Sequence, residues 1–220
     1  MTPEIIPSLL VESSAEFERR LRLVEEGCTT VHVDVMDGTL VPHTSWFDAL
    51  AVGEMRTPVA FELHLMVENP LPIITAWKKH VMGIKRAIIH AEIHRPLGAV
   101  LEQIREVHKL ETGVALNPET PLLAIEGVIH ALDQLTLLGV HPGASDQAFL
   151  GESVLAKIRD AHEHRSDLLI EIDGGVTLEN IQEIKKTGVS RFCAAHLLFA
   201  ASDPAEALKR AQSFVSTRPA

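Results

Sequence analysis

The chain has few cysteines and few aromatic residues, and it has no tyrosine. Its 220 residues include two cysteines, Cys28 and Cys193, and only 4% Phe, Trp and Tyr. Two cysteines so far apart form neither a disulfide framework nor a zinc motif, so we expect reduced, buried thiols in a cytoplasmic protein. So few aromatic side chains provide no platform for stacked bases, which argues against a single-stranded nucleic-acid binder.

Positive charge and long apolar segments are also scarce. Lysine and arginine number 20 against 30 aspartates and glutamates, a net charge of −10. Nucleic-acid affinity depends on phosphate neutralisation by basic side chains, so we expect no nucleic-acid partner. No apolar stretch approaches membrane-spanning length, and no basic region followed by an apolar run opens the chain. We therefore expect neither a membrane segment nor a secretory signal.

The sequence does contain a regular series of short apolar segments with strand periodicity. Eight strands are predicted, at 4–10, 31–38, 59–67, 86–92, 113–118, 134–140, 168–175 and 190–195. Segments typical of helices separate them, at about 14–26, 46–51, 70–77, 96–109, 122–128, 147–163 and 178–187, and a last helix follows 203.

Helix boundaries are marked by capping residues. Ser13 or Ser14 is expected to cap the first helix, and Gly27 is expected to end it as a C′ residue. Asp203, Pro204 and Glu206 form a capping-box arrangement at the start of the last helix.

Eight strands that alternate with helices predict a (β/α)₈ barrel, formed as a single domain by residues 1–220. An open, doubly wound parallel sheet is the alternative. No Gly-x-Gly-x-x-Gly follows the first strand, so the sequence favours the barrel.

The segment 31–38 carries polar residues where a buried strand has no packing need for them. Its valines alternate with His32, Asp34 and Met36, so these three side chains share one face. Burying an imidazole and a carboxylate costs several kcal/mol unless each finds a partner or a metal. A core histidine bonded to a neighbouring carboxylate is the simpler interpretation of this segment taken alone.

Polar residues recur at the C-terminal ends of other predicted strands, where the active sites of such barrels lie. Ser8, His32, Asp34, His64 and Asp173 occupy these positions. Two imidazoles and two carboxylates are ligand types for a divalent metal. The same set suits proton transfer at a carbon beside a carbonyl, with Asp34 and Asp173 serving opposite faces of the substrate. Taken alone, Asp173 is equally well explained as a capping acid before a glycine turn.

Five segments resemble the ribulose-phosphate 3-epimerase family: 6–10, 32–38, 64–70, 113–121 and 171–176. This resemblance implies a barrel that interconverts ribulose 5-phosphate and xylulose 5-phosphate through an enediolate. It also implies one divalent metal on His32, Asp34, His64 and Asp173, with Asp34 and Asp173 as the proton-transferring pair. The metal could be zinc, iron, manganese or cobalt.

The resemblance further implies a substrate pocket. Ser8 would contact the substrate, and Met36 and Met66 would line the pocket, although as bare residues they are typical core filling. The far end would comprise His141, Gly143, Ser145, Asp146, Gly174, Gly175, Ala195 and His196.

The chain departs from the family at this far end. Ser145 and Asp146 stand where the family has glycines, and Ala195-His196 replaces a Gly-Ser pair. Asp146 adds negative charge where a phosphate dianion would lie, although it could instead face solvent as a helix N-cap.

Three functions follow from these observations. The first is a ribulose-phosphate 3-epimerase with an altered phosphate loop, and the second is an epimerase of the same mechanism on another or unphosphorylated ketose. A non-catalytic barrel that binds a metal or sugar is the third, and it would not need both carboxylates. Family members commonly form homo-oligomers, so we expect one here.

Overall fold

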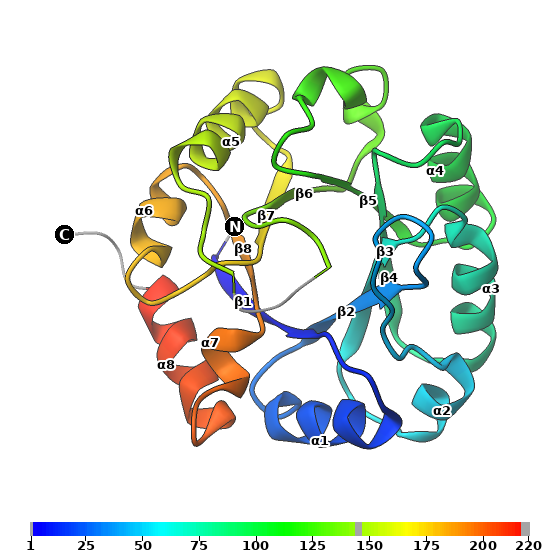
Figure 1. Cartoon of the computed structure of the whole chain (residues 1–220), viewed down its shortest axis with the longest axis vertical. Coiled ribbons are helices and arrows are strands. Elements are labelled where there is room, and N and C mark those ends of the chain that lie inside the picture. The colour runs from blue at the N-terminus through cyan, green and yellow to red at the C-terminus, as the bar shows by residue number, and fades with distance from the viewer. Residues whose placement is uncertain (1, 144–146, 217–220) are drawn as a thin grey trace.

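The computed structural model describes residues 2–143 and 147–216, which form a closed barrel of eight strands (Figure 1). Each strand is parallel to both neighbours, and β1 pairs with β8 to close the sheet. The predicted (β/α)₈ fold is confirmed. The strands are β1 (Glu4–Leu9), β2 (Thr30–Met36), β3 (Ala60–Met66), β4 (Ile84–His90), β5 (Glu111–Leu116), β6 (Gln134–Leu138), β7 (Leu169–Asp173) and β8 (Arg191–Ala194).

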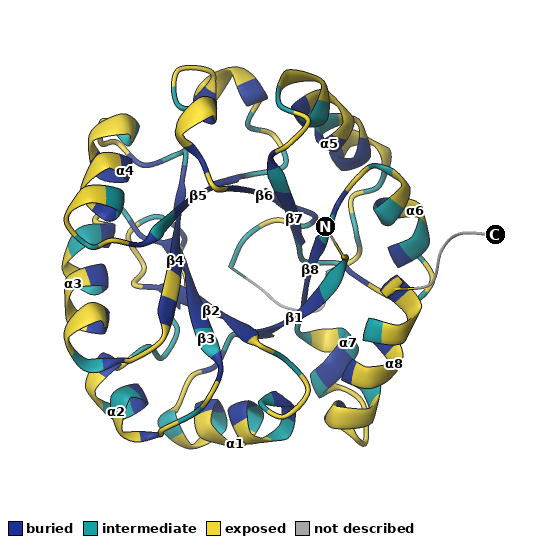
Figure 2. Ribbon diagram, turned by 180° about the vertical axis from the view of Figure 1, so that it is seen from behind, coloured by how far each residue is buried: buried dark blue, intermediate teal, exposed yellow. Residues whose placement is uncertain are grey.

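Helices surround the barrel, with buried residues on the side that faces the strands and exposed residues outside (Figure 2). On α1, for example, Phe17, Leu21 and Val24 are the buried stripe that the sequence predicted. The helices are α1 (Ser14–Val24), α2 (Ala49–Glu54), α3 (Pro70–His80), α4 (Leu97–Glu106), α5 (Glu152–His164), α6 (Ile181–Lys186), α7 (His196–Phe199) and α8 (Pro204–Ser216), with 3₁₀ turns η1 (Leu122–Ile125) and η2 (Ile129–Ala131). None of the described helices is long and apolar enough to span a membrane.

Some predicted helix boundaries are wrong. Gly27 has no left-handed conformation: α1 ends at Val24, and Glu25 caps it with right-handed backbone. A Cβ on Gly27 would lie 2.9 Å from Leu208 Cδ2 of α8, so a larger residue there would require the Leu208 side chain to shift. The short α7 has no counterpart among the predicted elements, and the helix predicted at 122–128 is a 3₁₀ turn followed by ordinary turns.

The helix predicted from 147 begins later, at Glu152. Gly151 precedes it with a φ of 75°, a backbone conformation that glycine adopts most readily. The segment before the helix runs along the barrel rim instead, where the Leu150 amide donates to the Gly139 carbonyl at 2.9 Å.

Strand register aligns the polar side chains of different strands. Asp34 on β2 pairs with His64 on β3, and Asp173 on β7 pairs with Cys193 on β8. Successive side chains along a strand point alternately into and out of the barrel, so these pairings place the inward side chains of neighbouring strands at the same level along the barrel axis. The barrel interior therefore collects polar groups that are widely separated in sequence.

The start of α8 provides a test of the capping prediction. The Asp203 carboxylate accepts a hydrogen bond from the Glu206 amide at 3.1 Å. Replacing Asp203 with alanine should lower the free energy of unfolding by about 0.5–2 kcal/mol, measured by urea denaturation. Asp203→Asn, which still offers an acceptor, should retain most of that stability, and equal losses in both variants would contradict the cap.

Candidate active site

A cavity of about 420 Å³ opens at the C-terminal ends of the strands. Its inner wall contains Ser8, Asp34, His64 and Asp173. At the far end the wall contains the predicted residues His141, Gly143, Gly174, Gly175, Ala195 and His196. The structure thus places these side chains around one space, at the rim where such barrels carry their active sites. Ser145 and Asp146 lie outside the described residues.

Asp34, His64 and Asp173 of the cavity wall meet His32, which is completely buried and does not itself line the cavity. His64 Nδ1 lies 3.0 Å from Asp34 Oδ1 and 3.2 Å from Asp173 Oδ2, so it stands between the two carboxylates. His32 Nε2 lies 3.5 Å from Asp34 Oδ1 and 3.9 Å from Asp173 Oδ2. One ligand atom from each of the four lies within 4.8 Å of all the others, a spacing suitable for a shared cation.

The donor atoms fit a divalent metal. His32 is completely buried, and its Nε2 has no hydrogen-bond partner. An unpaired buried nitrogen is costly unless something binds it. This nitrogen faces the same space as the two carboxylates and His64, and imidazole with carboxylate is an ordinary donor set for first-row metals.

Charges in the site are strongly coupled. Burial raises the pKa of Asp34, but the neighbouring imidazoles of His32 and His64 outweigh burial and hold that pKa well below its usual range. Burial lowers the pKa of His64, but hydrogen bonds with Asp173 and Asp34 raise it to about 9. Asp34 is therefore a carboxylate at neutral pH. The Ser8 hydroxyl donates to its Oδ2 at 2.6 Å, which leaves Oδ1 facing the histidines.

The cavity wall beside these groups is apolar. Met36 and Met66 are paired in register, line the cavity, and pack with Val41 and Leu10 in a small cluster apart from the main core. Thioethers are polarizable and adapt to an irregular surface. They provide a water-poor wall next to the ionised carboxylate.

The far end of the cavity is shaped by glycine backbone. Gly175 has a φ of 71°, and a Cβ there would lie 2.7 Å from Phe149 Cα. Gly143 has a φ of 103°, and a Cβ would lie 2.6 Å from the His43 ring. Gly175 has no room for a side chain, and both glycines have a positive φ that other residues rarely adopt, so the backbone itself forms the wall there.

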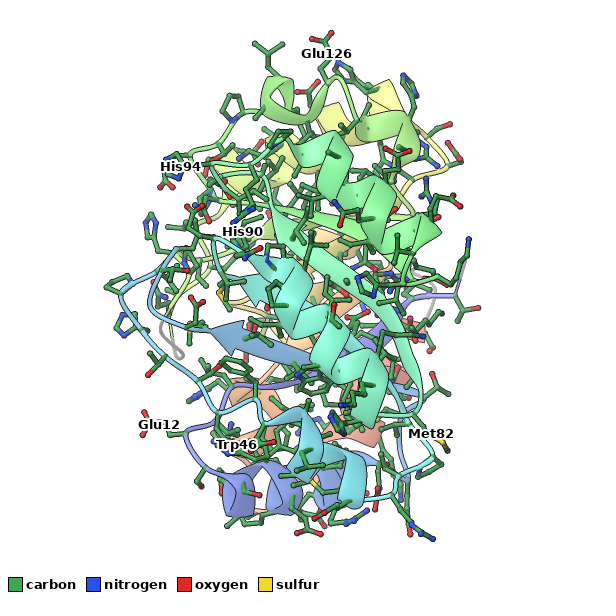
Figure 3. All side chains as sticks on the ribbon, turned by 90° about the vertical axis from the view of Figure 1, so that its right-hand side faces the viewer. Glu12, Trp46, Met82, His90, His94 and Glu126 are labelled. Carbon is green, nitrogen blue, oxygen red and sulfur yellow. The ribbon has the colours of Figure 1, made fainter. Side chains whose placement is uncertain are left out.

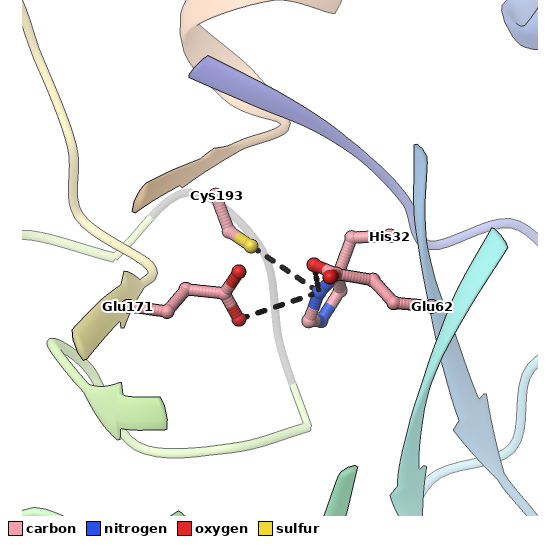
Figure 4. Close-up of side chains that lie close together, drawn as sticks. All are labelled: His32, Glu62, Glu171 and Cys193. Carbon is pink, nitrogen blue, oxygen red and sulfur yellow. Dashed lines mark hydrogen bonds and ion pairs between the residues drawn. The ribbon is translucent and has the colours of Figure 1, made fainter. Parts of the chain in front are cut away.

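A second group of polar side chains gathers around His32 Nδ1, the ring nitrogen that does not face Asp34 and Asp173 (Figure 4). His32 Nδ1 lies 2.9 Å from Glu62 Oε1, 3.2 Å from Cys193 Sγ and 3.7 Å from Glu171 Oε1. All four side chains are buried. Glu62, Glu171 and Cys193 were not predicted from the sequence as neighbours of the site.

The two glutamates of this group are already paired with arginines. Arg191 bonds to both Glu62 and Glu171, and Arg86 Nη1 bonds to Glu62 at 2.8 Å. Burial and the nearby Glu62 carboxylate raise the pKa of Glu171 to about 7. A second metal beside two guanidinium groups would be repelled, so this group supports His32 rather than binding a cation.

His64 is also supported from behind, by residues that were not predicted from the sequence. Its Nε2 lies 2.9 Å from His90 Nε2, and His90 Nδ1 lies 2.9 Å from Glu92 Oε2. The sequence contained a signal for the two glutamates around His32. Glu62 and Glu171 precede His64 and Asp173 by two residues, so they lie on the same strand face as these predicted ligands. His90 ends β4 in the same way that the predicted ligands end their strands.

Comparison with known proteins identifies the family of the chain. Residues 4–199 match the Ribulose-phosphate 3 epimerase family. The chain belongs to this family. A ribulose-phosphate 3-epimerase of Bacillus subtilis is 34% identical over 213 residues, covering 93% of this chain and 96% of the relative. A chloroplastic ribulose-5-phosphate-3-epimerase of Arabidopsis thaliana is 35% identical, covering 98% of this chain and 78% of the relative. The predicted enzyme class, a carbohydrate epimerase, is thereby confirmed.

Solved structures at low identity share the fold of this ribulose-phosphate 3-epimerase family member. KGPDC from Streptococcus mutans superimposes with a TM-score of 0.75 at 12% identity, covering 98% of each chain. A 3-hexulose-6-phosphate synthase gives a TM-score of 0.69 at 16% identity, covering 97% of this chain and 99% of that chain. At these identities the likeness concerns the barrel alone.

The buried arginine cluster gives a stability prediction for this epimerase-family barrel. Arg191→Met leaves Glu62 and Glu171 buried without their shared cation and should cost about 3–5 kcal/mol of unfolding free energy, measured by urea denaturation. As a control, Arg19→Met removes an exposed ion pair with Glu16 and should change stability little. Similar losses of unfolding free energy in the two variants would show that the buried arginine cluster stabilises the fold no more than an exposed ion pair does.

Proposed function

We propose that this protein is a metal-dependent ketose-phosphate 3-epimerase that interconverts D-ribulose 5-phosphate and D-xylulose 5-phosphate by proton transfer between two carboxylates. The observation that carries the proposal is the meeting of His32, Asp34, His64 and Asp173 within 4.8 Å at the base of one cavity. Family membership and relatives named for this activity support it.

His32 Nε2, His64 Nδ1 and one oxygen from each of Asp34 and Asp173 would hold the metal. A divalent cation bound there would stabilise the negative charge that develops on the substrate oxygens. The remaining chemistry belongs to the protein. Ser8 and His64 fix the Asp34 carboxylate from two sides, so its orientation is set before substrate enters.

Inversion at C3 requires that a proton leave one face of the carbon and another arrive on the opposite face. One carboxylate, Asp34 or Asp173, takes the C3 proton, and the electron pair of that bond moves toward the C2 carbonyl to form an enediolate. The other returns a proton to the opposite face of C3 and restores the carbonyl. Asp34 on β2 and Asp173 on β7 come from different sides of the barrel, as this exchange of faces requires.

Met36 and Met66 would line the pocket beside the reacting carbons. Their apolar wall strengthens the electrostatic interactions of the carboxylates by excluding water. The far end of the pocket, with Gly143, Gly174, Gly175, Ala195 and His196, would receive the terminal group of the substrate. There, backbone amides of the glycine segments are the groups able to approach an anion closely.

A second candidate is an epimerase of the same mechanism on an unphosphorylated ketose. Two imidazole-bearing residues, His141 and His196, line the far end of the cavity, and Ala195-His196 replaces the family's Gly-Ser pair. An imidazole N–H can donate a hydrogen bond to a hydroxyl oxygen as well as to a phosphate oxygen. Cytoplasmic location and homo-oligomeric state remain predictions from sequence.

Loss of either carboxylate should remove the reaction without loss of the fold. Asp34→Asn and Asp173→Asn should each lower kcat for ribulose 5-phosphate by about 100-fold or more, because each removes one proton-transfer group. The measurement is a coupled epimerisation assay, with circular dichroism to verify folding. As a control, Asp160→Asn on the exposed face of α5 should keep wild-type activity. Near-normal turnover by a folded Asp34→Asn or Asp173→Asn protein would refute the two-carboxylate mechanism.

Removal of the metal should abolish turnover reversibly. Dialysis against a strong chelator should leave a folded protein without epimerase activity, and Zn²⁺, Fe²⁺, Mn²⁺ or Co²⁺ should restore it, because the enediolate charge needs a cation. Full activity in protein shown to be metal-free by elemental analysis would contradict the proposed metal site.

The two candidate substrates are separated by direct comparison. We expect kcat/KM for ribulose 5-phosphate to exceed that for ribulose by a large factor, because a phosphate adds binding energy that the hydroxyl lacks. The measurement is epimerisation of both ketoses by the same metal-loaded preparation. A preference for unphosphorylated ribulose would favour the second candidate.

A further inference from the structure

A chain of hydrogen bonds runs from the proposed metal site to a carboxylate outside it. It begins at His64 Nδ1, which faces Asp34 and Asp173, and continues from His64 Nε2 to His90 Nε2 at 2.9 Å. The ring planes differ by 9° and the ring centroids are 5.0 Å apart, so the rings meet edge to edge. His90 Nδ1 then lies 2.9 Å from Glu92 Oε2.

Glu92 is held in place as an acceptor. Its other oxygen, Oε1, accepts from the Asn117 amide at 2.9 Å and from the Thr120 hydroxyl. Burial raises the pKa of Glu92, but hydrogen bonds from His90, Thr120 and Asn117 lower it to about 2. The carboxylate therefore has no proton to donate, and every group that contacts it must supply one.

The loop that supplies two of these donors is itself fixed. Lys157 on α5 donates to three backbone carbonyls of this loop, Asn117 at 2.9 Å, Pro118 at 2.7 Å and Thr120 at 2.6 Å. The ammonium group thus fixes the Asn117–Thr120 turn against the helix. Because this turn supplies two of the donors to Glu92, Lys157 also helps to hold the Glu92 carboxylate in position.

An acceptor at Glu92 determines where the protons lie along the chain. His90 must carry its proton on Nδ1 to donate to Glu92, and a neutral His90 then has only a lone pair at Nε2. His64 must carry its proton on Nε2 to donate to that lone pair. Without a metal, His64 Nδ1 also carries a proton, which it donates to Asp34. When a metal displaces that proton, the proton on Nε2 stays in place, and Nδ1 presents its lone pair on the side that faces Asp34 and Asp173.

We propose that Glu92, acting through His90, is a positioning residue that fixes the tautomer of His64 and directs its Nδ1 lone pair at the metal. The inference rests on the proposed function, because it needs His64 to be a ligand. Glu62 holds His32 in the same manner through one bond, 2.9 Å from Nδ1, with Nε2 left free. Both histidine ligands are therefore oriented by a carboxylate behind them.

The substitution Glu92→Gln tests this arrangement with almost no change of shape. The amide oxygen still accepts from Asn117 and Thr120, so the NH₂ group faces His90 Nδ1 and donates to it. The order of donors along the chain is reversed, and His64 carries its proton on Nδ1, where it competes with a metal. Binding of Co²⁺, measured by competition with a chromophoric chelator, should weaken by about 10–100-fold.

A matched control exists on the protein surface. Glu68 also accepts from a histidine Nδ1, at 2.7 Å from His94, and this pair lies away from the cavity. Figure 3 shows His94 at the outer edge of the molecule and His90 further in, among the strands. Glu68→Gln makes the same chemical change at an exposed Glu–His pair and should leave Co²⁺ affinity unchanged.

Two variants of His90 keep the proposal testable should Glu92→Gln not fold. His90→Gln can still present an acceptor oxygen to His64 and should bind Co²⁺ within about 3-fold of wild type, whereas the apolar His90→Met should lose about 10–100-fold. Nitrogen chemical shifts of the His90 ring, measured by NMR on the metal-free protein, should show a protonated Nδ1 in the wild type and a protonated Nε2 in Glu92→Gln.

The outcomes separate this inference from the proposed function. A wild-type protein that binds no Co²⁺ would contradict the metal-dependent function, and the inference with it. A wild-type protein that binds Co²⁺, with Glu92→Gln and His90→Met binding it equally tightly, would overturn the inference alone. Wild-type affinity in Glu68→Gln together with weakened binding in the other two would support it.

Discussion

Charge buried inside the barrel is the constraint on which the rest of this structure depends. Such barrels are commonly filled by branched apolar side chains, but here the interior holds ionised carboxylates, histidines and arginines. Each isolated charge would cost several kcal/mol, so each needs a partner from another strand. Arg191 provides the clearest case, because it bonds to Glu4 of β1, Glu62 of β3 and Glu171 of β7. The buried carboxylates are therefore neutralised by Arg191 only when the sheet is closed and these strands surround one interior.

The same requirement orients the candidate active site. His32 and His64 each have one nitrogen facing the cavity base and the other bonded, directly or through His90, to an ionised carboxylate. The cavity-facing atoms are consequently defined before any ligand enters. Preorganised groups of this kind stabilise developing charge without the cost of reorganisation during the reaction. The charge network thus links the stability of the barrel to its proposed chemistry.

The eight strands could be predicted because apolar residues recur along each segment with the period of a strand. The sequence predicted His32, Asp34, His64 and Asp173 as a group because all lie at strand ends that a barrel brings together. The supporting residues were missed, since the contact of His90 with His64 joins two strands and becomes visible only once β3 and β4 lie side by side. Helix starts such as Glu152 were also missed, because apolar periodicity does not report the positive φ of Gly151 or the hydrogen bond of Leu150 to Gly139 that precede the helix.

The most direct test of the account is the fate of the C3 proton when ribulose 5-phosphate is epimerised in D₂O. Two carboxylates on opposite faces predict that, in the first turnovers, the xylulose 5-phosphate formed carries deuterium at C3 while recovered ribulose 5-phosphate keeps protium, as measured by proton NMR. Product that keeps protium at C3, or equal deuterium in substrate and product from the outset, would contradict the assignment of Asp34 and Asp173 as an opposed proton-transfer pair.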